Sequence, residues 1–226
     1  GVLRLARDER DAARLARIAA QPIWPEAALR PVDARSAAAI LGEATSRTGL
    51  LMADALVVEP PTLLRAWLAE TDIRSGRVIG VQPGARPAVR LNGDERLEAD
   101  AIILSAGWGT ADLGLTNLRP VRGQLFWTEG HRARPAVWGS GYCVPTPSGT
   151  LVGATHDRGR SDVEIDPEDT SSLLSMLQAV RPALARELTE VQTTARAAVR
   201  ATTSDHLPLC GALGEGVWTL GGLGGR

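Results

Sequence analysis

The spacing of apolar residues changes along the chain, and each change predicts a different element. Residues 2–5, which are mostly apolar, predict a short strand. Over 10–20 apolar residues recur at helical spacing until Pro22 ends the run. A second helix is predicted over 33–41, because Asp is a good N-cap residue and Gly42 follows the last apolar position.

The next part of the chain predicts one helix and then several strands. Residues 49–70 indicate two short strands followed by a helix. Three more strands are predicted over 77–81, 88–91 and 96–98. Asn92-Gly93 predicts a two-residue type I′ turn between the last two, since both central positions of that turn need a positive φ.

A continuous apolar run, AIILSAG over 101–107, predicts a parallel strand that is buried on both faces. Small residues at its C-terminal end suit a ligand that approaches the edge of the sheet. Further strands are predicted over 119–130, 137–144 and 150–155, with a hairpin between the last two across Pro147-Ser148-Gly149.

Two helices and two strands complete the pattern. The helices are predicted over 166–180 and 182–188, the first with Asp166 as its cap and a proline at its first position. One of the strands carries Arg200, and the other covers 217–220.

Composition narrows the class of protein. A chain of 226 residues with 44% apolar and 23% charged residues is typical of a folded globular protein. The net charge is −1, every basic residue is Arg, and the arginines form no dense cluster. The sequence therefore has no general signature of nucleic-acid binding. Cys143 and Cys210 lie in unrelated apolar segments, which predicts two buried, reduced thiols. Without a signal-peptide core or an apolar run of about 18 residues, we expect a cytoplasmic protein that does not enter a membrane.

Candidate chemistry gathers at residues 197–226, AAVRATTSDHLPLCGALGEGVWTLGGLGGR. A strand carrying Arg200 leads into a Thr-Ser-Asp-His-Leu-Pro turn, and a second strand leads into a glycine-rich loop. Closely spaced glycines let backbone N–H groups crowd against a phosphate or a flat ring. His131, His156 and His206 have no partners at metal spacing, so no metal site is predicted.

This ending resembles the FAD-dependent amine and amino-acid oxidoreductases of the D-amino-acid oxidase and glycine oxidase superfamily. Three upstream segments carry the same resemblance in the same order: ADAIILSAGWGT, RPVRGQLFWTEG and GYCVPTPSGTLVGATHDRG. The implied fold is α+β, with an incomplete Rossmann-like α/β part for FAD and an antiparallel-sheet substrate domain with flanking helices. Residues 1–48 and 119–199 would belong to the substrate side, and 49–118 and 200–226 to the FAD-binding side.

The resemblance also implies roles for individual residues. FAD would be contacted by Ala106, Gly107, Trp108, Gly123, Gln124, Gly221, Gly222, Leu223, Gly224 and Gly225. Arg200 matches the carboxylate-binding arginine of the family, Tyr142 matches a tyrosine that holds the same carboxylate, and Arg226 would be a second basic group beside the flavin. On the residues alone, Tyr142 fits a half-buried strand tyrosine equally well.

The implied activity is oxidation of a C–N bond in an amine that bears a carboxylate. The residues of the DHLP turn and of the glycine loop favour one branch of the family, which removes a carboxymethyl group from a modified wobble uridine in tRNA. In that branch the flavin domain is fused to a methyltransferase domain. The near-neutral charge favours instead a glycine- or D-amino-acid-type oxidase of small amines. Because the family's GxGxxG unit and final helix are missing, we expect an internal part of a longer protein. A third alternative is therefore a non-catalytic part that does not bind FAD.

Overall fold

The computed structural model of the chain describes residues 1–25, 28–115, 117–130, 135–139 and 141–224. Helices and strands are mixed along the chain, and the fold class is α+β, as predicted. The chain divides into two compact units. The first unit comprises Gly1–Ala66, Gln124–Thr155 and Glu164–Ala197, and the second comprises Trp67–Gly123, His156–Val163 and Ala198–Arg226.

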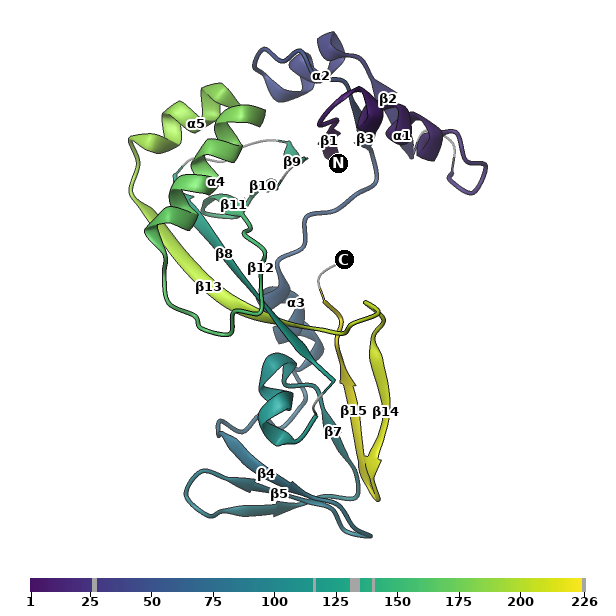
Figure 1. Cartoon of the computed structure of the whole chain (residues 1–226), viewed down its shortest axis with the longest axis vertical. Coiled ribbons are helices and arrows are strands. Elements are labelled where there is room, and N and C mark those ends of the chain that lie inside the picture. Colours follow the sequence, from purple (N-terminus) through teal and green to yellow (C-terminus); the bar gives the residue numbers. More distant parts are fainter. Residues whose placement is uncertain (26–27, 116, 131–134, 140, 225–226) are drawn as a thin grey trace. The chain divides into compact units, whose positions relative to one another are not determined.

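The largest sheet of the described residues brings together strands from both ends of the sequence (Figure 1). Its strands lie in the order β12 (Asp157–Arg158), β8 (Arg119–Glu129), β11 (Gly149–Gly153), β10 (Tyr142–Pro145), β9 (Ala136–Trp138), β1 (Val2–Leu5), β3 (Gly49–Met52) and β2 (Leu29–Val32). Strand β13 (Thr193–Thr202) also pairs with β8. Strands β1 and β9 run parallel, and β8 is antiparallel to both β11 and β12. Strands β8 and β13 each contribute residues to both units.

Two helices of the first unit begin at aspartate capping residues. Asp8 and Asp33 accept backbone N–H groups at the starts of α1 (Glu9–Ala19) and α2 (Ala34–Leu41). Gly42 ends α2 in the left-handed conformation, at φ +71°, which glycine adopts without a steric penalty. These two helices therefore confirm the prediction made from capping and spacing.

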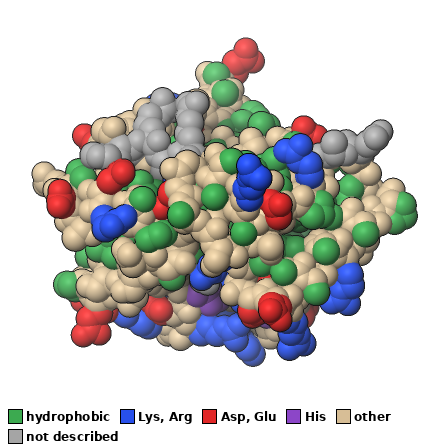
Figure 2. Space-filling model, turned by 90° about the horizontal axis from the view of Figure 1, so that it is seen from above, with side chains coloured by type: hydrophobic (Ala, Val, Ile, Leu, Met, Phe, Trp, Pro, Cys, Tyr) green, Lys and Arg blue, Asp and Glu red, His purple; other side chains and the backbone are tan. Residues whose placement is uncertain are grey.

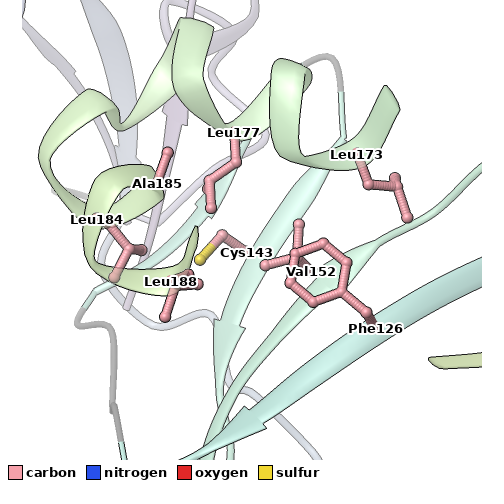
Figure 3. Close-up of a cluster of buried hydrophobic side chains, with 8 residues drawn as sticks. All are labelled: Phe126, Cys143, Val152, Leu173, Leu177, Leu184, Ala185 and Leu188. Carbon is pink, nitrogen blue, oxygen red and sulfur yellow. The ribbon is translucent and has the colours of Figure 1, made fainter. Parts of the chain in front are cut away.

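The core of the first unit lies where α4 (Pro167–Val180) and α5 (Pro182–Thr189) cover the sheet (Figure 3). Side chains from both helices meet side chains from β8, β10 and β11 in one cluster: Phe126, Cys143, Val152, Leu173, Leu177, Leu184, Ala185 and Leu188. Burial raises the pKa of the Cys143 thiol to about 11, against a smaller opposing effect of the Arg181 charge. Cys143 is thus a buried free thiol, as predicted.

The second unit contains two smaller sheets. One is the meander β4 (Val78–Gln82), β5 (Ala88–Leu91) and β6 (Arg96–Glu98), whose strands were all predicted. The other has the order β14 (Leu209–Gly214), β15 (Val217–Gly221) and β7 (Ile102–Leu104). Strand β7 runs parallel to β15, which confirms a parallel pairing for the AIILSAG run. A 3₁₀ helix, η1 (Gly107–Leu113), follows β7.

Three predictions about strands and turns were wrong. Only β3 forms in 49–59 before α3 (Pro60–Trp67), since Leu56–Val58 stay exposed without a strand partner and two prolines that lack N–H groups follow. The turn between β5 and β6 has its positive φ values at Gly93 and Asp94, one residue later than a type I′ turn on Asn92-Gly93 requires. The predicted strand over 137–144 is two antiparallel strands, β9 and β10, because the chain reverses where the Gly139 N–H donates to the Gly141 carbonyl.

Two predictions about burial were also wrong. Ile103, in the middle of β7, is 66% exposed, so this strand is buried on one face only among the described residues. Cys210 is exposed, as are most residues of β14, an edge strand of its sheet. Within the described ranges, no helix has the length and apolar character that crossing a lipid bilayer requires.

Asp11 is a buried carboxylate that joins α1 to β1. It accepts hydrogen bonds from Arg14 Nη2 at 2.9 Å and from the Arg7 backbone N–H at 3.2 Å, and Arg4 Nη2 lies 3.4 Å away. Burial alone would raise the pKa of Asp11, but these donors and the charge of Arg4 together lower it from 3.8 to about 2.

We predict that Asp11→Asn lowers the free energy of unfolding at neutral pH by about 1–2 kcal/mol, because the anion is held by charge-assisted hydrogen bonds. In the wild type this contribution is complete above the unfolded pKa near 4 and is lost as the pH falls to about 2. Denaturant unfolding across this range should show a weaker acid dependence for the variant. Glu70→Gln, at an exposed position, is the control. Equal acid dependence in the variant and the wild type would contradict this role.

Candidate functional site

A cavity of about 520 Å³ lies within the second unit, in the size range of small-molecule sites. Four segments that are distant in sequence line it. They are the start of β8 (Arg119, Pro120, Val121), the chain around β12 (His156, Arg158, Gly159), the end of β13 with the turn after it (Thr202, Thr203, Ser204, His206) and the loop after β15 (Gly222, Leu223, Gly224).

Alternation along β8 determines which side chains share a face with this cavity. The twofold period of a strand puts positions 119, 121 and 123 on one face and Arg122 on the other. Pro120, between Arg119 and Val121, also lines the cavity. Arg158 on β12 is paired with Val121, so it shares the first face. Continuing this antiparallel register places His156 opposite Gly123, on the same face.

Arg200 lies directly against Gly123. A Cβ built at Gly123 would be 2.7 Å from Cζ of Arg200, so the missing side chain leaves room for the guanidinium group. Any larger residue at 123 would displace Arg200. The sequence placed these two residues in one site, and the structure brings them together.

Arg122 is a buried charge that is neutralised on the opposite face. Its side chain is 0% exposed, and Nη1 donates to Asp157 at 3.0 Å while Nε lies 3.3 Å from Asp162. A hydrogen bond from Arg160, added to the charge of Arg122, lowers the pKa of Asp162. Acidic groups near β12 are therefore engaged away from the cavity.

The loop after β15 presents backbone to the cavity. Gly222 and Gly224 have φ values of +65° and +67°, which favour glycine. A Cβ at Gly222 would lie 2.8 Å from Cγ2 of Thr203. Gly222, Leu223 and Gly224 were predicted to contact a cofactor, and all three line the cavity. Gly221, also predicted, is the last residue of β15 and immediately precedes them.

The two histidines of the site lie on different segments. His206, at φ +62° in the turn after β13, lines the cavity together with His156. Partial burial lowers the pKa of His156, and the positive charges of Arg200 and Arg158 lower it further, against an opposing effect of Asp157. The neutral imidazole is thus favoured beside arginines, and Figure 2 shows a histidine side chain with arginine side chains next to it.

The other predicted site residues lie elsewhere. Ala106 and Gly107 lie at the start of η1, and Trp108 packs against a small cluster that includes Leu118 and Ala201. The Gln124 side chain is buried and hydrogen-bonded to Asp166 and Thr170 at the start of α4. Tyr142 belongs to the first unit, where its hydroxyl lies close to Gly153. Gly225 and Arg226 lie outside the described residues.

Sequence reasoning missed Arg119 and Arg158. Arg119 opens the RPVRGQ segment, and alternation along that strand would have separated it from Arg122. Arg158 could not be placed from local patterns, because its position depends on pairing between β8 and β12. Thr202 and Thr203 were quoted only as part of the strand and turn that follow Arg200.

We predict that Arg200→Gln raises the pKa of His156. Of the two arginine charges that favour the neutral ring, that of Arg200 has the larger effect on this pKa. Arg158→Gln should raise it less. NMR titration of the histidine ring protons measures both shifts. Arg74→Gln, which removes an exposed arginine paired with Asp72, is the matched control and should leave His156 unchanged. An unchanged His156 pKa in Arg200→Gln would contradict the described placement of Arg200.

Comparison with known proteins places the chain among flavoenzymes. It is 41% identical over 235 residues to the tRNA 5-methylaminomethyl-2-thiouridine biosynthesis bifunctional protein of Caulobacter sp. (strain K31), an alignment that covers 100% of this chain and 38% of that protein. The corresponding protein of Nitrosospira multiformis is 30% identical over 250 residues, in an alignment that covers 100% of this chain and 40% of that protein. The chain thus spans about two fifths of the relatives that it matches.

Solved structures agree on the fold. Glycine oxidase from Geobacillus kaustophilus superposes with a TM-score of 0.79 at 19% identity, covering 99% of this chain and 65% of that one. Iminodiacetate oxidase from Chelativorans sp. BNC1 gives 0.80 at 22% identity, covering 99% and 66%. The sequence profile of the family described as "DAO: FAD dependent oxidoreductase" matches residues 1–226. The chain therefore belongs to the DAO family of FAD-dependent oxidoreductases, as its motifs predicted.

Proposed function

We propose that this chain is the part of an FAD-dependent enzyme that oxidises the C–N bond of a carboxymethylaminomethyl group on a tRNA wobble uridine and so removes the carboxymethyl group. The observation that carries the proposal is the Arg200 guanidinium against the bare backbone at Gly123, beside an arginine-lined cavity. The identity of 41% to a protein named for tRNA 5-methylaminomethyl-2-thiouridine biosynthesis supports the choice of substrate.

The loop residues fit FAD. Two glycines at positive φ present backbone without a side chain to the cavity, so a flat ring can approach main-chain N–H groups there. When bound, FAD supplies the oxidant that takes up a hydride from the carbon beside the nitrogen. Gly222, Leu223 and Gly224 would hold it through their backbone. Contacts from Ala106, Trp108 and Gln124 remain predictions.

Arg200 would orient the substrate through its carboxylate. A guanidinium group can donate two parallel, charge-assisted hydrogen bonds to a carboxylate, which fixes the direction of the adjacent carbon as well as binding the anion. Loss of hydride from that carbon and of the N–H proton leaves a C=N bond, which water hydrolyses to the aminomethyl uridine and a two-carbon aldehyde acid. Tyr142 and Arg226 as further carboxylate contacts remain predictions.

His156 would suit the proton balance of this reaction. An amine transfers hydride from its neutral form, so a substrate that arrives protonated must first lose a proton. The charges of Arg200 and Arg158 keep the nearby imidazole neutral, and in that form it can accept a proton. The same positive charges disfavour a protonated amine in the cavity.

A glycine- or D-amino-acid-type oxidase is the second candidate function. It is favoured by the net charge of −1, which gives no overall attraction for RNA. Both candidates use a carboxylate-binding arginine, and they differ in whether the amine is attached to a nucleoside.

The proposal is tested by titrating the full-length protein with FAD and then adding substrate, while visible absorbance is followed. Bleaching of the flavin by carboxymethylaminomethyl-uridine tRNA, and not by glycine, is the expected result. Bleaching by glycine alone would favour the second candidate. Failure to bind FAD would overturn both and leave a non-catalytic part.

We predict that Arg200→Gln lowers kcat/KM for the tRNA by about 10- to 100-fold, the effect of losing hydrogen bonds to a charged group. Arg200→Lys should lie between the variant and the wild type, because it keeps the charge and loses the planar fork. Steady-state kinetics with Arg74→Gln as control measure this loss. Equal kcat/KM for wild type and Arg200→Gln would contradict a carboxylate-binding role.

A further inference from the structure

We propose that Arg119 and Arg158 form a second anion-binding position at this cavity, and that it holds a phosphate group of the RNA substrate next to the nucleoside that is oxidised. This inference rests on the proposed function. It concerns two arginines for which the sequence predicted no role. It assigns them a phosphate, whereas Arg200 is assigned the carboxylate.

The geometry brings the two side chains together. Arg158 is paired across the strands with Val121, and Arg119 lies two residues from Val121 along β8. Such diagonal neighbours on one face of an antiparallel pair have Cα atoms about 7–8 Å apart, within reach of long side chains. Both residues line the same cavity, so the two guanidinium groups can converge on one tetrahedral anion there.

The local charge favours an anion at this position. In the part of the chain that the structure describes, neither Arg119 nor Arg158 takes part in an ion pair. Both are exposed, so they are hydrated and can reach a ligand. Two aspartates that adjoin cavity residues in the sequence are engaged elsewhere: Asp157 contacts buried Arg122, and Asp205 accepts the Leu207 N–H within its turn.

Arginine pairs suit phosphate more closely than they suit a second carboxylate here. The amine substrate of the proposed reaction has one carboxylate, and Arg200 is assigned to it. A nucleotide within RNA carries flanking phosphates, which arginine binds through parallel N–H groups. Contacts of this kind position RNA without reading its sequence, and each phosphate neutralised makes binding weaker as salt is raised.

The test uses the full-length protein and a fluorescently labelled stem-loop RNA with the tRNA wobble position in its loop. Fluorescence anisotropy gives the binding constant over a series of salt concentrations. In the double variant Arg119→Gln/Arg158→Gln, the slope of log Kobs against log salt should become shallower by about 0.7, the value for one phosphate contact on a single strand. Arg74→Gln, another exposed arginine of the second unit, should keep the wild-type slope.

Kinetics with two substrates separate phosphate from carboxylate. The assays are run at a pH of about 8, where a histidine of ordinary pKa is already neutral, so that His156 has the same charge in the double variant and the wild type. For the stem-loop RNA, KM should then rise about 10-fold in the double variant with kcat retained, because binding is weakened uniformly. For the free modified nucleoside, which has the carboxylate and no phosphate, KM should not change. Inorganic phosphate should raise KM for the stem-loop RNA less in the double variant than in the wild type.

An unchanged salt slope in the double variant overturns the proposal, and so does an equal rise in KM for the nucleoside, which would assign the pair to the carboxylate. Absence of any oxidation by the wild type would overturn the proposed function, whereas the anisotropy measurement would still decide whether these arginines bind RNA phosphate. Circular dichroism and the flavin spectrum of the double variant check that it is folded.

Discussion

The contact between the Arg200 guanidinium and the backbone at Gly123 is the constraint on which the candidate site depends. Space for the guanidinium exists only because residue 123 has no side chain. Alternation along β8 then places Arg119 and Val121 on the same face as Gly123, and pairing with β12 adds Arg158 and the following register position, His156. A methyl group at position 123 would therefore displace Arg200. That would change both the charge that lowers the pKa of His156 and the proposed carboxylate contact.

The opposite face of β8 makes this arrangement tolerable. Arg122 is fully buried and would be costly without partners, so Asp157 and Asp162 lie against it. Those two aspartates belong to the same short segment as His156 and Arg158. Because they turn toward Arg122, their charge is compensated on that side, and the cavity side keeps an excess of positive charge. The twofold periodicity of β8 thus places Arg122, which is neutralised by aspartates, and Arg119, which lines the cavity, on opposite faces of the strand.

Much of the fold could be predicted because its signals are local. Caps and spacing located α1, α2, α4 and α5, and hydrophobic runs located most strands. The errors arose where tertiary pairing decides the outcome. Leu56–Val58 have strand composition without a strand partner, and Ile103 lies on a face that no described residue covers. For the site, the glycine loop and Arg200 carried motif signals, whereas Arg158 became visible only through the β8–β12 register.

Net charge is a poor guide to what this chain can bind. A value of −1 argues against a broad electrostatic attraction to RNA, and no dense run of arginines appears in the sequence. Yet two arginines and two histidines line one cavity, and Arg200 lies near enough to lower the pKa of one of those histidines, His156, while Asp157 and Asp205 serve a buried ion pair and a turn. A protein that must hold one nucleotide in a flavin site needs charge at that point rather than over its whole surface. A near-neutral chain with a locally basic cavity is therefore compatible with a nucleic-acid substrate whose binding is directed mainly by a carboxylate and one adjacent phosphate.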